Sequence, residues 1–533
     1  MEKGLEAYRA GLLAYPELDF GLWLDLSRAG LPAADASLDA RLAAALRANA
    51  ELEAGAIANP DENRQVGHYW LRAPELAPSP EHAAAIRETV AAVARFAGRV
   101  HSGEIRGPGG AFTDLLVIGI GGSALGPQLL ADALGGPGDR LRTHFIDNTD
   151  PDGFDRAWAG LADRLDRTLV VVMSKSGGTP EPRNALRETA ARWRAAGLRL
   201  GAQAVAVTGS GSQLDKEAVA EGFLARFPMW DWVGGRTSVM GPVGLVPAAL
   251  QGLDTAALLA GAAEMDALTR SPDLARNPAA RLAGAWLHLT EGKAKRAMVV
   301  LPYKDRLVLL SRYLQQLVME SLGKSHDLSG KLVRQGLTVY GNKGSTDQHA
   351  YVQQLRDGPD DFFAVFVEVL RDREGASPEV EPGITSGDYL QAFLLGTREA
   401  LSSQGKRSLT LTLDAVDARA LGRVIALFER AVGLYANLLH INAYHQPGVE
   451  AGKKAASDAL GVLRAALRVL EARAGQPMSA EAIAGEIGLE AGAETVFKVC
   501  LRLSRNGRLA CSPHADPAKT LFQTRPLPNS PAP

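Results

Sequence analysis

Residues 117–123 read VIGIGGS and residues 172–179 read VMSKSGGT, and these two stretches decide the fold. In each of them an apolar strand ends in a loop of glycine and hydroxyl residues, and a helical segment follows. Glycines let a backbone turn sharply and bring its N–H groups close to an anion, and a helix that starts just beyond adds its positive end. One such loop is weak evidence. Two in succession, the second with Lys175, predict a phosphorylated small molecule bound at one set of strand ends.

Short β-branched runs alternate with helical segments around these loops, which predicts a parallel sheet with helices on both faces. The first strands are expected at 114–120, 142–147, 167–173 and 203–208, with helices near 124–135, 180–196 and 212–221. The pattern restarts with apolar runs at 297–302, 337–340, 362–370 and 408–413, so we expect a second α/β domain. A long helical stretch follows over 417–473, with a break at 446–448.

The chain is long enough to bury several cores. We predict an α/β protein with a first domain over 106–285 and a second domain with C-terminal helices over 286–474. Residues 1–105 are expected to form a helical segment that packs on this core, and we see no chemistry there. A small separate module is expected over 475–533, with residues 526–533 as a frayed tail.

Composition excludes several classes of function. Of the 533 residues, 46% are hydrophobic and 22% are charged, and the formal net charge is −2, so the chain as a whole is not attracted to nucleic acid or to anionic membranes. Its two cysteines, Cys500 and Cys511, cannot build a disulfide framework or a Cys-based metal cluster. The N-terminus mixes charges where a signal peptide has an apolar run, and no apolar stretch reaches 18 residues. We therefore expect a cytoplasmic protein that is neither secreted nor membrane-spanning.

The first loop also fits another class of ligand. Residues 119–124 match the relaxed dinucleotide fingerprint G-x-G-x-x-G/A, and Asp147 ends the next strand, where a carboxylate could bind a ribose. A dinucleotide site, however, needs neither the hydroxyl of Ser123 nor a second phosphate-type loop. From the residues alone, a sugar phosphate is favoured, while a nucleotide and a purely structural turn stay open.

Candidate catalytic side chains lie further along the chain. Gln316 and Glu320 share one face of an otherwise apolar helix by their i, i+4 spacing, and burial on that face would suit the carboxylate to take a proton from carbon. Arg236 follows two glycines, which let its guanidinium reach a cleft. Taken singly, a glutamate such as Glu320 is more often solvated or salt-bridged, His349 is more typical of a structural histidine, and Lys453 of a surface charge.

Taken together, these segments resemble the phosphoglucose isomerase family, which is built from two sugar-isomerase (SIS) domains. The resemblance runs from about residue 114 to 455, and six segments match in the family's order, which is far more specific than any one of them. The matching segments are 119–123 (GIGGS), 174–176 (SKS) with Thr179, 234–238 (GGRTS), 316–324 (QLVMESLGK), 347–350 (DQHA) and 446–453 (QPGVEAGK). The resemblance implies two SIS-type doubly wound, mostly parallel sheets flanked by helices.

It also implies a reaction, the reversible isomerisation of glucose 6-phosphate and fructose 6-phosphate through a cis-enediol, with no redox cofactor and no metal. At the matching positions Glu320 is the base that shuttles the proton, and Arg236 offers positive charge to the enediolate. His349 and Lys453 assist ring opening, and His349 comes from the neighbouring chain of a homodimer with shared active sites. The substrate is held by Gly122, Ser123, Ser174, Lys175, Ser176, Thr179, Gln316 and Gln446.

The sequence departs from the family pattern at Thr237, where an aromatic residue is usual, and at Leu322, where Asn is usual. Neither departure removes a group with a chemical role. A SIS-domain sensor that binds a sugar phosphate without turnover needs no proton shuttle, so the intact Glu320, Arg236 and His349 favour an enzyme. Activity on mannose 6-phosphate stays open, because this C2 epimer differs only in how the base meets that carbon.

The resemblance does not cover residues 475–533. A capped helix start at 479–484, a second helix near 493–505 and a two-stranded turn ending near 520–522 resemble a winged helix-turn-helix. Basic side chains outnumber acidic ones by only one in this segment, too few for strong attraction to phosphates. The basic residues are Lys498, Arg502, Arg505, Arg508, Lys519 and Arg525, and the acidic ones are Glu481, Glu486, Glu490, Glu494 and Asp516. We therefore expect a structural or protein-contact role rather than nucleic-acid binding.

Overall fold

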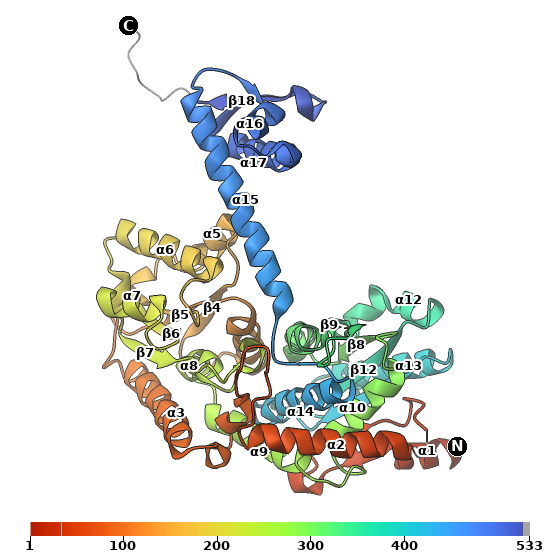
Figure 1. Cartoon of the computed structure of the whole chain (residues 1–533). Helices are drawn as coiled ribbons and strands as arrows, with labels where there is room; N and C mark the ends of the chain where they lie inside the picture. Colours follow the sequence, from red (N-terminus) through yellow and green to blue (C-terminus); the bar gives the residue numbers. More distant parts are fainter. Residues whose placement is uncertain (1, 33–34, 526–533) are drawn as a thin grey trace. The chain divides into compact units, whose positions relative to one another are not determined.

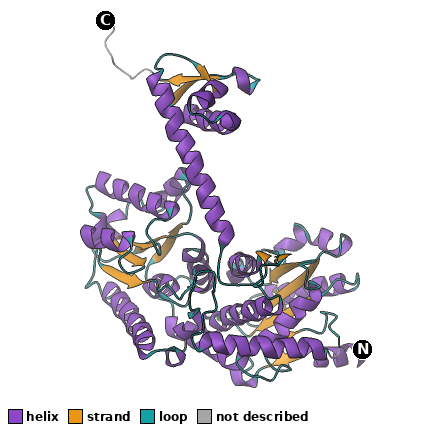
Figure 2. Cartoon of the chain, viewed as in Figure 1, coloured by secondary structure: helices purple, strands orange, loops and turns teal. Residues whose placement is uncertain are grey.

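The computed structural model describes residues 2–32 and 35–525, and the side chains of residues 2–4, 449–451 and 453 also lie outside the description. The tail expected at 526–533 is likewise outside the described residues. The chain divides into two compact units, Met1–His445 and Gln446–Pro533. Figure 1 labels helices and strands of both units, and Figure 2 shows that each unit contains both helices and strands.

The first sheet of unit 1 consists of five parallel strands in the order β4-β3-β5-β6-β7. Its central strands are runs of β-branched and aliphatic residues, and β5, with the sequence TLVVVM, is buried along its whole length. Such continuous apolar strands are typical of a parallel sheet covered on both faces. The strands are β3 (Asp114–Ile118), β4 (Arg142–Ile146), β5 (Thr168–Met173), β6 (Ala204–Thr208) and β7 (Ala225–Pro228).

Helices cover this sheet on both sides, as the alternation of the sequence predicted (Figure 1). Alternate residues of the strands, such as Val170 and Val172, pack with Phe154, Trp158 and Trp193 on one face. Their neighbours Leu169 and Val171 face the main core on the other side. The first face carries α5 (Pro151–Ala159), α6 (Pro180–Ala195) and α7 (Gln213–Glu221), and the second carries α3 (Pro80–His101), α4 (Leu125–Leu134) and α8 (Pro242–Gln251).

The second sheet of unit 1 has six strands in the order β1-β2-β15-β12-β8-β11. Four of them are parallel, which confirms the second α/β domain, while β2 pairs antiparallel with β15 and β1 pairs antiparallel with β2. The helical interpretation of residues 1–105 was therefore incomplete, because two short strands from this segment extend the second sheet. The strands are β1 (Leu12–Ala14), β2 (Leu22–Asp25), β8 (Ala297–Pro302), β11 (Val339–Tyr340), β12 (Phe362–Val369) and β15 (Ser408–Leu413).

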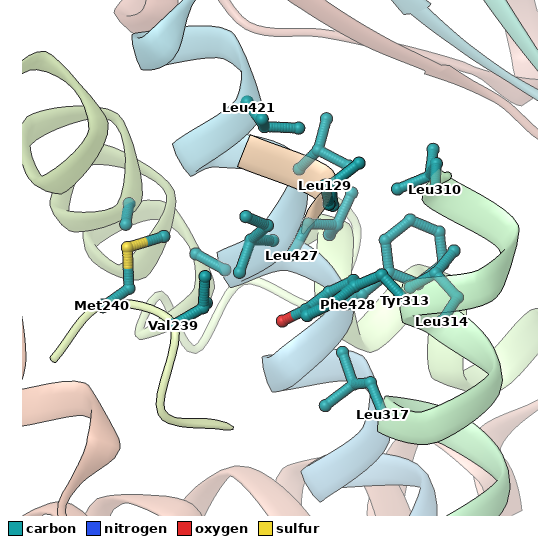
Figure 3. Packing of buried hydrophobic residues seen from close by; sticks show 14 of the residues in the cluster. Leu129, Val239, Met240, Leu310, Tyr313, Leu314, Leu317, Leu421, Leu427 and Phe428 are labelled. Carbon is teal, nitrogen blue, oxygen red and sulfur yellow. The ribbon is translucent and has the colours of Figure 1, made fainter. Parts of the chain in front are cut away.

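A helix at the centre of unit 1, α14 (Ala418–Leu438), belongs to a core shared by both sheets. Figure 3 shows Leu421, Leu427 and Phe428 of α14 beside Leu129 of α4 and beside Leu314. Because one hydrophobic cluster contains residues of both sheets and of α14, the two sheets of unit 1 share a single core. The remaining long helices of unit 1 are α1 (Glu2–Gly11), α2 (Ala36–Glu53), α9 (Thr255–Thr269), α10 (Pro278–Leu289) and α13 (Ser386–Ser402).

Unit 2 has the element order of a winged helix, as predicted for residues 475–533, and it also includes the long helix that precedes them. A three-stranded antiparallel sheet in the order β16-β18-β17 packs with its helices around Ile483, Val496, Leu503 and Phe522. The elements are α15 (Pro447–Ala472), β16 (Met478–Ser479), α16 (Ala480–Glu486), α17 (Ala493–Arg505), β17 (Leu509–Ser512) and β18 (Leu521–Thr524). Across the described residues of both units, no helix is both long enough and apolar enough to cross a bilayer.

Candidate active site

The first glycine loop lies between β3 and α4 and touches the loop that carries Arg236. Gly121 has a φ of +57°, which favours glycine, and it opens a short 3-10 turn over Gly121–Ser123. A Cβ atom on Gly122 would lie 2.0 Å from the carbonyl oxygen of Gly235, so only glycine permits this close approach. A Cβ atom on Gly121 would lie 3.1 Å from Nε2 of Gln316. The turn therefore brings Gly122 and Ser123 next to two other segments that the sequence singled out.

The second loop follows β5 and leads into α6. Because β3 and β5 are parallel neighbours, both loops leave the same edge of the first sheet. The hydroxyl of Ser174 accepts a hydrogen bond from the N–H of Gly177 at 3.1 Å, and that of Ser176 accepts one from Gly178 at 3.1 Å. Thr179 precedes Pro180, the first residue of α6, and its hydroxyl does not cap the helix. The turn is thus held by its own hydroxyls at a helix N-terminus, the arrangement that suits an anion.

Lys175 connects this loop to the segment before Arg236. Its ammonium donates to the carbonyl oxygens of Asp231 and Val233 at 3.2 and 3.4 Å and lies 3.3 Å from the Asp231 carboxylate. Burial lowers the pKa of Lys175, and Asp231 acts in the opposite direction. The lysine is therefore a charge held at the edge of the site rather than a mobile surface group.

Arg236 is a buried cation at the junction of three segments. Its side chain is 6% exposed. The guanidinium donates to the carbonyl oxygens of Ala443 at 3.0 Å and His445 at 3.3 Å, and to the hydroxyl of Ser321 at 3.4 Å. Burial lowers the pKa of Arg236, whereas Glu320 acts to raise it. Two backbone carbonyls thus fix the guanidinium while leaving it near a carboxylate.

That carboxylate is Glu320, at the end of a π-helical turn over Gln315–Glu320 that continues α11 (Leu310–Leu314). A π-turn often marks a functional position, because it rotates side chains away from the regular helical register. Nε of Arg236 lies 3.3 Å from Oε2 of Glu320, and the Glu320 side chain is 20% exposed. Among the described residues, this buried Oε2 atom has no hydrogen-bond partner of good geometry. A native carboxylate oxygen left in this state is available for a bond to a ligand or a proton.

Lys324 was not singled out by the sequence analysis, although it lies within the matched segment 316–324. Its ammonium donates to the backbone carbonyl of Glu320 at 2.7 Å. Burial, followed by the charge of Arg236, lowers the pKa of Lys324 to about 8, and Glu320 and Asp61 act in the opposite direction. Its place at the end of a matched segment was the signal that could have identified it.

No chemistry was predicted for residues 1–105, and one segment of them lies close to the residues that hold Arg236. Residues 59–64 contact the segment 442–445, whose carbonyl groups accept from Arg236. The signal was weak, since Asn59 and Asp61 lie in a polar turn without a recognisable motif.

The remaining site candidates lie elsewhere. His349 ends a short 3-10 turn over Thr346–His349 and is exposed, and within the described residues no hydrogen bond or ion pair joins its ring to Glu320. Neighbouring Asp347 is buried and anchors the turn by accepting from the N–H of Asn342 at 2.9 Å. Gln446 and Lys453 belong to unit 2, where Gln446 precedes α15 and Lys453 lies within it, with its side chain outside the described part. Gly122, Ser123, Ser174, Lys175, Arg236, Gln316 and Glu320 all belong to unit 1.

The arrangement in unit 1 suits the transfer of a proton at carbon. A carboxylate with an unpartnered oxygen can accept the proton, and a fixed guanidinium beside it can stabilise the negative charge that develops on the substrate. Two loops of the kind that binds anions lie at the same sheet edge, and they can hold a phosphate group of the substrate. Binding of this remote group can position the reacting carbon atoms at the carboxylate.

Comparisons with known proteins agree with this chemistry. The family model for phosphoglucose isomerase matches residues 37–399 and 398–474. The glucose-6-phosphate isomerase of Synechococcus elongatus is 59% identical over 495 residues, which cover 92% of this chain and 93% of that protein. That of Geobacter sulfurreducens is 60% identical over 495 residues, with the same coverage of 92% and 93%. The crystal structure of a glucose-6-phosphate isomerase from Chlamydia trachomatis is similar to this chain with a TM-score of 0.76 and 27% identity, over 88% of this chain and 94% of that one.

Proposed function

Because this chain belongs to the phosphoglucose isomerase family, we infer that it interconverts glucose 6-phosphate and fructose 6-phosphate, an aldose-ketose isomerisation of glycolysis and gluconeogenesis. The observation that carries a role for particular residues is the pair formed by the buried Arg236 and the half-buried Glu320, next to two loops of the kind that binds anions.

Glu320 is the base. In the open-chain aldose its carboxylate takes the proton from C2, the electron pair of that C–H bond forms the C1–C2 double bond, and the carbonyl electrons move to O1. In the resulting cis-enediolate O1 takes up the proton that O2 gives up, the protonated Glu320 delivers its proton to C1, and the electron pair left on O2 re-forms a carbonyl at C2, which gives the ketose. The unpartnered Oε2 atom of Glu320 supports this role, because a carboxylate closed by several hydrogen bonds would be a weaker base.

Arg236 stabilises the enediolate that forms between the two proton transfers. Its guanidinium is fixed by backbone carbonyls before the substrate binds, so little reorganisation is needed when charge develops. Removal of one such donor typically lowers kcat by about 10²–10³-fold.

The loops bind the 6-phosphate and the adjacent sugar. Ser123, Ser174, Lys175, Ser176 and Thr179 supply hydroxyls, charge and helix N-termini, and Gly122 permits the close contact between loops. Gln316, one turn before Glu320 and next to Gly121, orients a hydroxyl of the substrate. In the same way Gln446 is proposed to orient a hydroxyl, a role that rests on the family motif.

His349 and Lys453 open the sugar ring, and His349 acts in the neighbouring subunit of a homodimer. The exposure of His349 supports this, since a ring on the surface can enter a site on another chain. The test is complementation. Inactive Glu320→Gln and inactive His349→Ala chains are mixed, and heterodimers are expected to regain one of two sites. Demonstrated chain exchange without recovered activity would contradict the shared site.

A coupled assay without added metal, in which fructose 6-phosphate yields glucose 6-phosphate, tests the proposed function directly. A sugar-phosphate sensor would bind the substrate in calorimetry without turnover, and a dehydrogenase would reduce NAD. Addition of mannose 6-phosphate to the same assay shows whether the base also serves the C2 epimer. A cytoplasmic location is part of the proposal and is supported by the low number of cysteines in the sequence, Cys500 and Cys511.

A further inference from the structure

Residues 59–64 form a small closed turn in the N-terminal segment. The N–H of Asn59 donates to the carbonyl of Arg64 at 3.2 Å, and the N–H of Arg64 donates back to the carbonyl of Asn59 at 3.1 Å. Asn59 is only 3% exposed, although the turn belongs to no sheet. Its side chain is therefore buried against something other than its own segment.

The neighbour is the segment 442–445, more than 370 residues away in sequence. The side-chain N–H₂ of Asn59 donates to the carbonyl of Tyr444 at 3.3 Å. Asn442, which is 5% exposed, donates from its own N–H₂ group to Oδ1 of Asn59 at 3.0 Å and to Oδ2 of Asp61 at 2.6 Å. Its Oδ1 atom accepts from the N–H of Tyr444 at 2.8 Å. Both ends of the Asn442 amide are thus used to fix the path of this segment.

The fixed segment presents its carbonyl groups to Arg236. Ala443 lies between Asn442 and Tyr444, and His445 follows them. Their backbone carbonyl oxygens accept hydrogen bonds from the guanidinium of Arg236 at 3.0 and 3.3 Å. The segment 442–445 has no helix or strand structure of its own. A displacement of its backbone would therefore move the acceptors, and with them the cation that lies 3.3 Å from Glu320.

We propose that Asn59, Asp61 and Asn442 are positioning residues that hold Arg236 in place for the enediolate, so that the N-terminal turn is part of the catalytic apparatus. The proposal rests on the proposed function. The role of the three residues predicts a loss of kcat with little change in KM. The two glycine loops at the first sheet take no part in these hydrogen bonds of Asn59, Asp61 and Asn442. Ground-state binding of the sugar phosphate is expected to survive, while stabilisation of the charged intermediate is lost.

The test uses the full chain with Asn442→Ala. Asn437→Ala is the matched control, since this asparagine near the end of α14 also donates to a carbonyl, that of Gly433 at 3.0 Å, but is exposed. We expect Asn442→Ala to lower kcat about 10–100-fold, the effect of a displacement of roughly 1 Å, with KM within about threefold of wild type. The control is expected to keep both constants.

Two ligands separate positioning from general damage. Arabinonate 5-phosphate carries a carboxylate where the enediolate develops, whereas sorbitol 6-phosphate has the phosphate but no such charge. In Asn442→Ala the Kd of the sugar acid is expected to rise by about the same factor as kcat falls, and that of sorbitol 6-phosphate to change less than threefold. Equal weakening of both ligands, or a kcat within twofold of wild type, would overturn the proposal.

A second pair of variants keeps the test valid where Asn442→Ala folds poorly. Asp61→Ala removes one acceptor of Asn442 on an exposed turn, and Asp61→Asn restores an amide oxygen at the same place, so activity is expected to fall in the first and largely return in the second. On an Arg236→Ala background, Asp61→Ala is expected to add less than twofold, because residues that act through one group are non-additive. Full additivity would contradict the proposal. A wild-type chain without isomerase activity would instead contradict the proposed function.

Discussion

Arg72 with Asp266 and Arg236 with Glu320 are both arginine–carboxylate pairs with buried cations, and their geometries differ. Arg72 donates to both oxygens of Asp266, at 2.7 and 3.0 Å, and Arg430 adds a third hydrogen bond at 2.9 Å. Arg236 approaches a single oxygen of Glu320 at 3.3 Å, and that oxygen has no hydrogen-bond partner among the described residues. We call the first the closed pair and the second the open pair.

The difference shows in the electrostatics. Although burial acts to raise it, the pKa of Asp266 is held well below its usual range by the guanidinium groups of Arg430 and Arg72. The two cations differ: although burial acts to lower it, the pKa of Arg72 is raised by Asp266 and Glu429, whereas burial lowers the pKa of Arg236 and the charge of Glu320 does not restore it. In the closed pair both carboxylate oxygens of Asp266 accept from arginines, so the loss of one partner would leave a buried charge uncompensated. In the open pair the Oε2 atom of Glu320 accepts no hydrogen bond of good geometry within the described part of the chain, which makes it a candidate for contact with a ligand.

The largest expected effect comes from the carboxylate of the open pair. Glu320→Gln removes the proton acceptor and almost no volume, so we expect kcat to fall by about 10²–10⁴-fold while substrate binding and stability stay close to wild type. The measurements are steady-state kinetics, calorimetric binding of glucose 6-phosphate and urea unfolding. Glu399→Gln is the control, since that carboxylate is 68% exposed and pairs with Arg28 on the surface. More than about a hundredth of the wild-type kcat would place the base elsewhere.

The same change in the closed pair is expected to act on the fold. Asp266→Asn leaves the buried cations of Arg72 and Arg430 without their shared carboxylate, which typically costs about 3–5 kcal/mol in the free energy of unfolding. Activity per folded molecule is expected to persist. Urea unfolding measures the loss, and Asp163→Asn, at a surface pair with 78% exposure of the carboxylate, is expected to change the free energy by less than about 0.5 kcal/mol. Unchanged stability of Asp266→Asn would remove the distinction between the pairs.

Removal of the groups that we propose to bind the phosphate is expected to affect binding before chemistry. Lys175→Ala combined with Ser174→Ala removes a half-buried ammonium and the hydroxyl that organises its loop. Loss of a hydrogen bond to a charged group is typically worth about 1.5–3 kcal/mol, so we expect KM for the phosphorylated sugars to rise by about 10–100-fold, with a smaller change in kcat. Lys216→Ala, at an exposed position of α7, is the control. An unchanged KM would exclude these residues from the phosphate site.

A smaller effect is expected from Lys324, whose ammonium lies against the open pair. Its pKa is lowered to about 8, so between pH 8 and the unfolded value of about 10.4 the folded chain holds fewer protons than the unfolded one at this residue. Stability from this group therefore rises with pH in that window. The groups that face it are Arg236, Glu320, Asp61 and His445. Burial lowers the pKa of His445, and the charge of Lys324 lowers it further.

The measurement compares wild type with Lys324→Met by urea unfolding at pH 7.5 and pH 9.5. The difference between them is expected to shift in favour of wild type at the higher pH, since the variant has no proton to lose there. Lys331→Met, at an exposed lysine, provides the control and is expected to show no such shift. A shift of opposite sign would mean that Lys324 gains stability from its charge, as in a closed pair.

The residues of the open pair were singled out from the sequence, and what holds them was not. Arg236, Gln316 and Glu320 lie in local patterns, two glycines before a cation and an i, i+4 face, but taken singly a glutamate such as Glu320 is more often solvated or salt-bridged, and the matched family segments decided the prediction. The support from Asn59, Asp61 and Asn442 joins positions more than 380 residues apart through single polar side chains, for which no periodicity exists.

Prediction of the strands from the sequence had the same limit, because local patterns were visible and long-range pairing was not. The strands at 114–118 and 168–173 are continuous apolar runs between glycine loops, so their existence and parallel pairing followed from the pattern. Strands β1 and β2 have three and four residues; β2 pairs antiparallel with the edge of β15, with Leu24 opposite Leu411, and β1 pairs with β2 in turn. Pairing of this kind is set by tertiary context rather than by local propensity.

The smallest effect is expected from removal of residues 475–533, because both the open and the closed pair belong to unit 1. The deletion ends beyond the family match at 474 and takes away α16, α17 and the small antiparallel sheet. We expect kcat and KM to stay within about twofold, with any change confined to stability or assembly, measured by urea unfolding and light scattering.

The deletion also exposes Ala466 and Leu470 of α15, so a deletion variant with these two residues changed to Ser and Gln serves as its soluble counterpart. A kcat loss above tenfold would mean that this segment serves the open pair. Tight, salt-dependent binding of duplex DNA by the full chain but not by the deletion variant would contradict the structural or protein-contact role, since the six basic residues of the segment would then outweigh its five acidic ones.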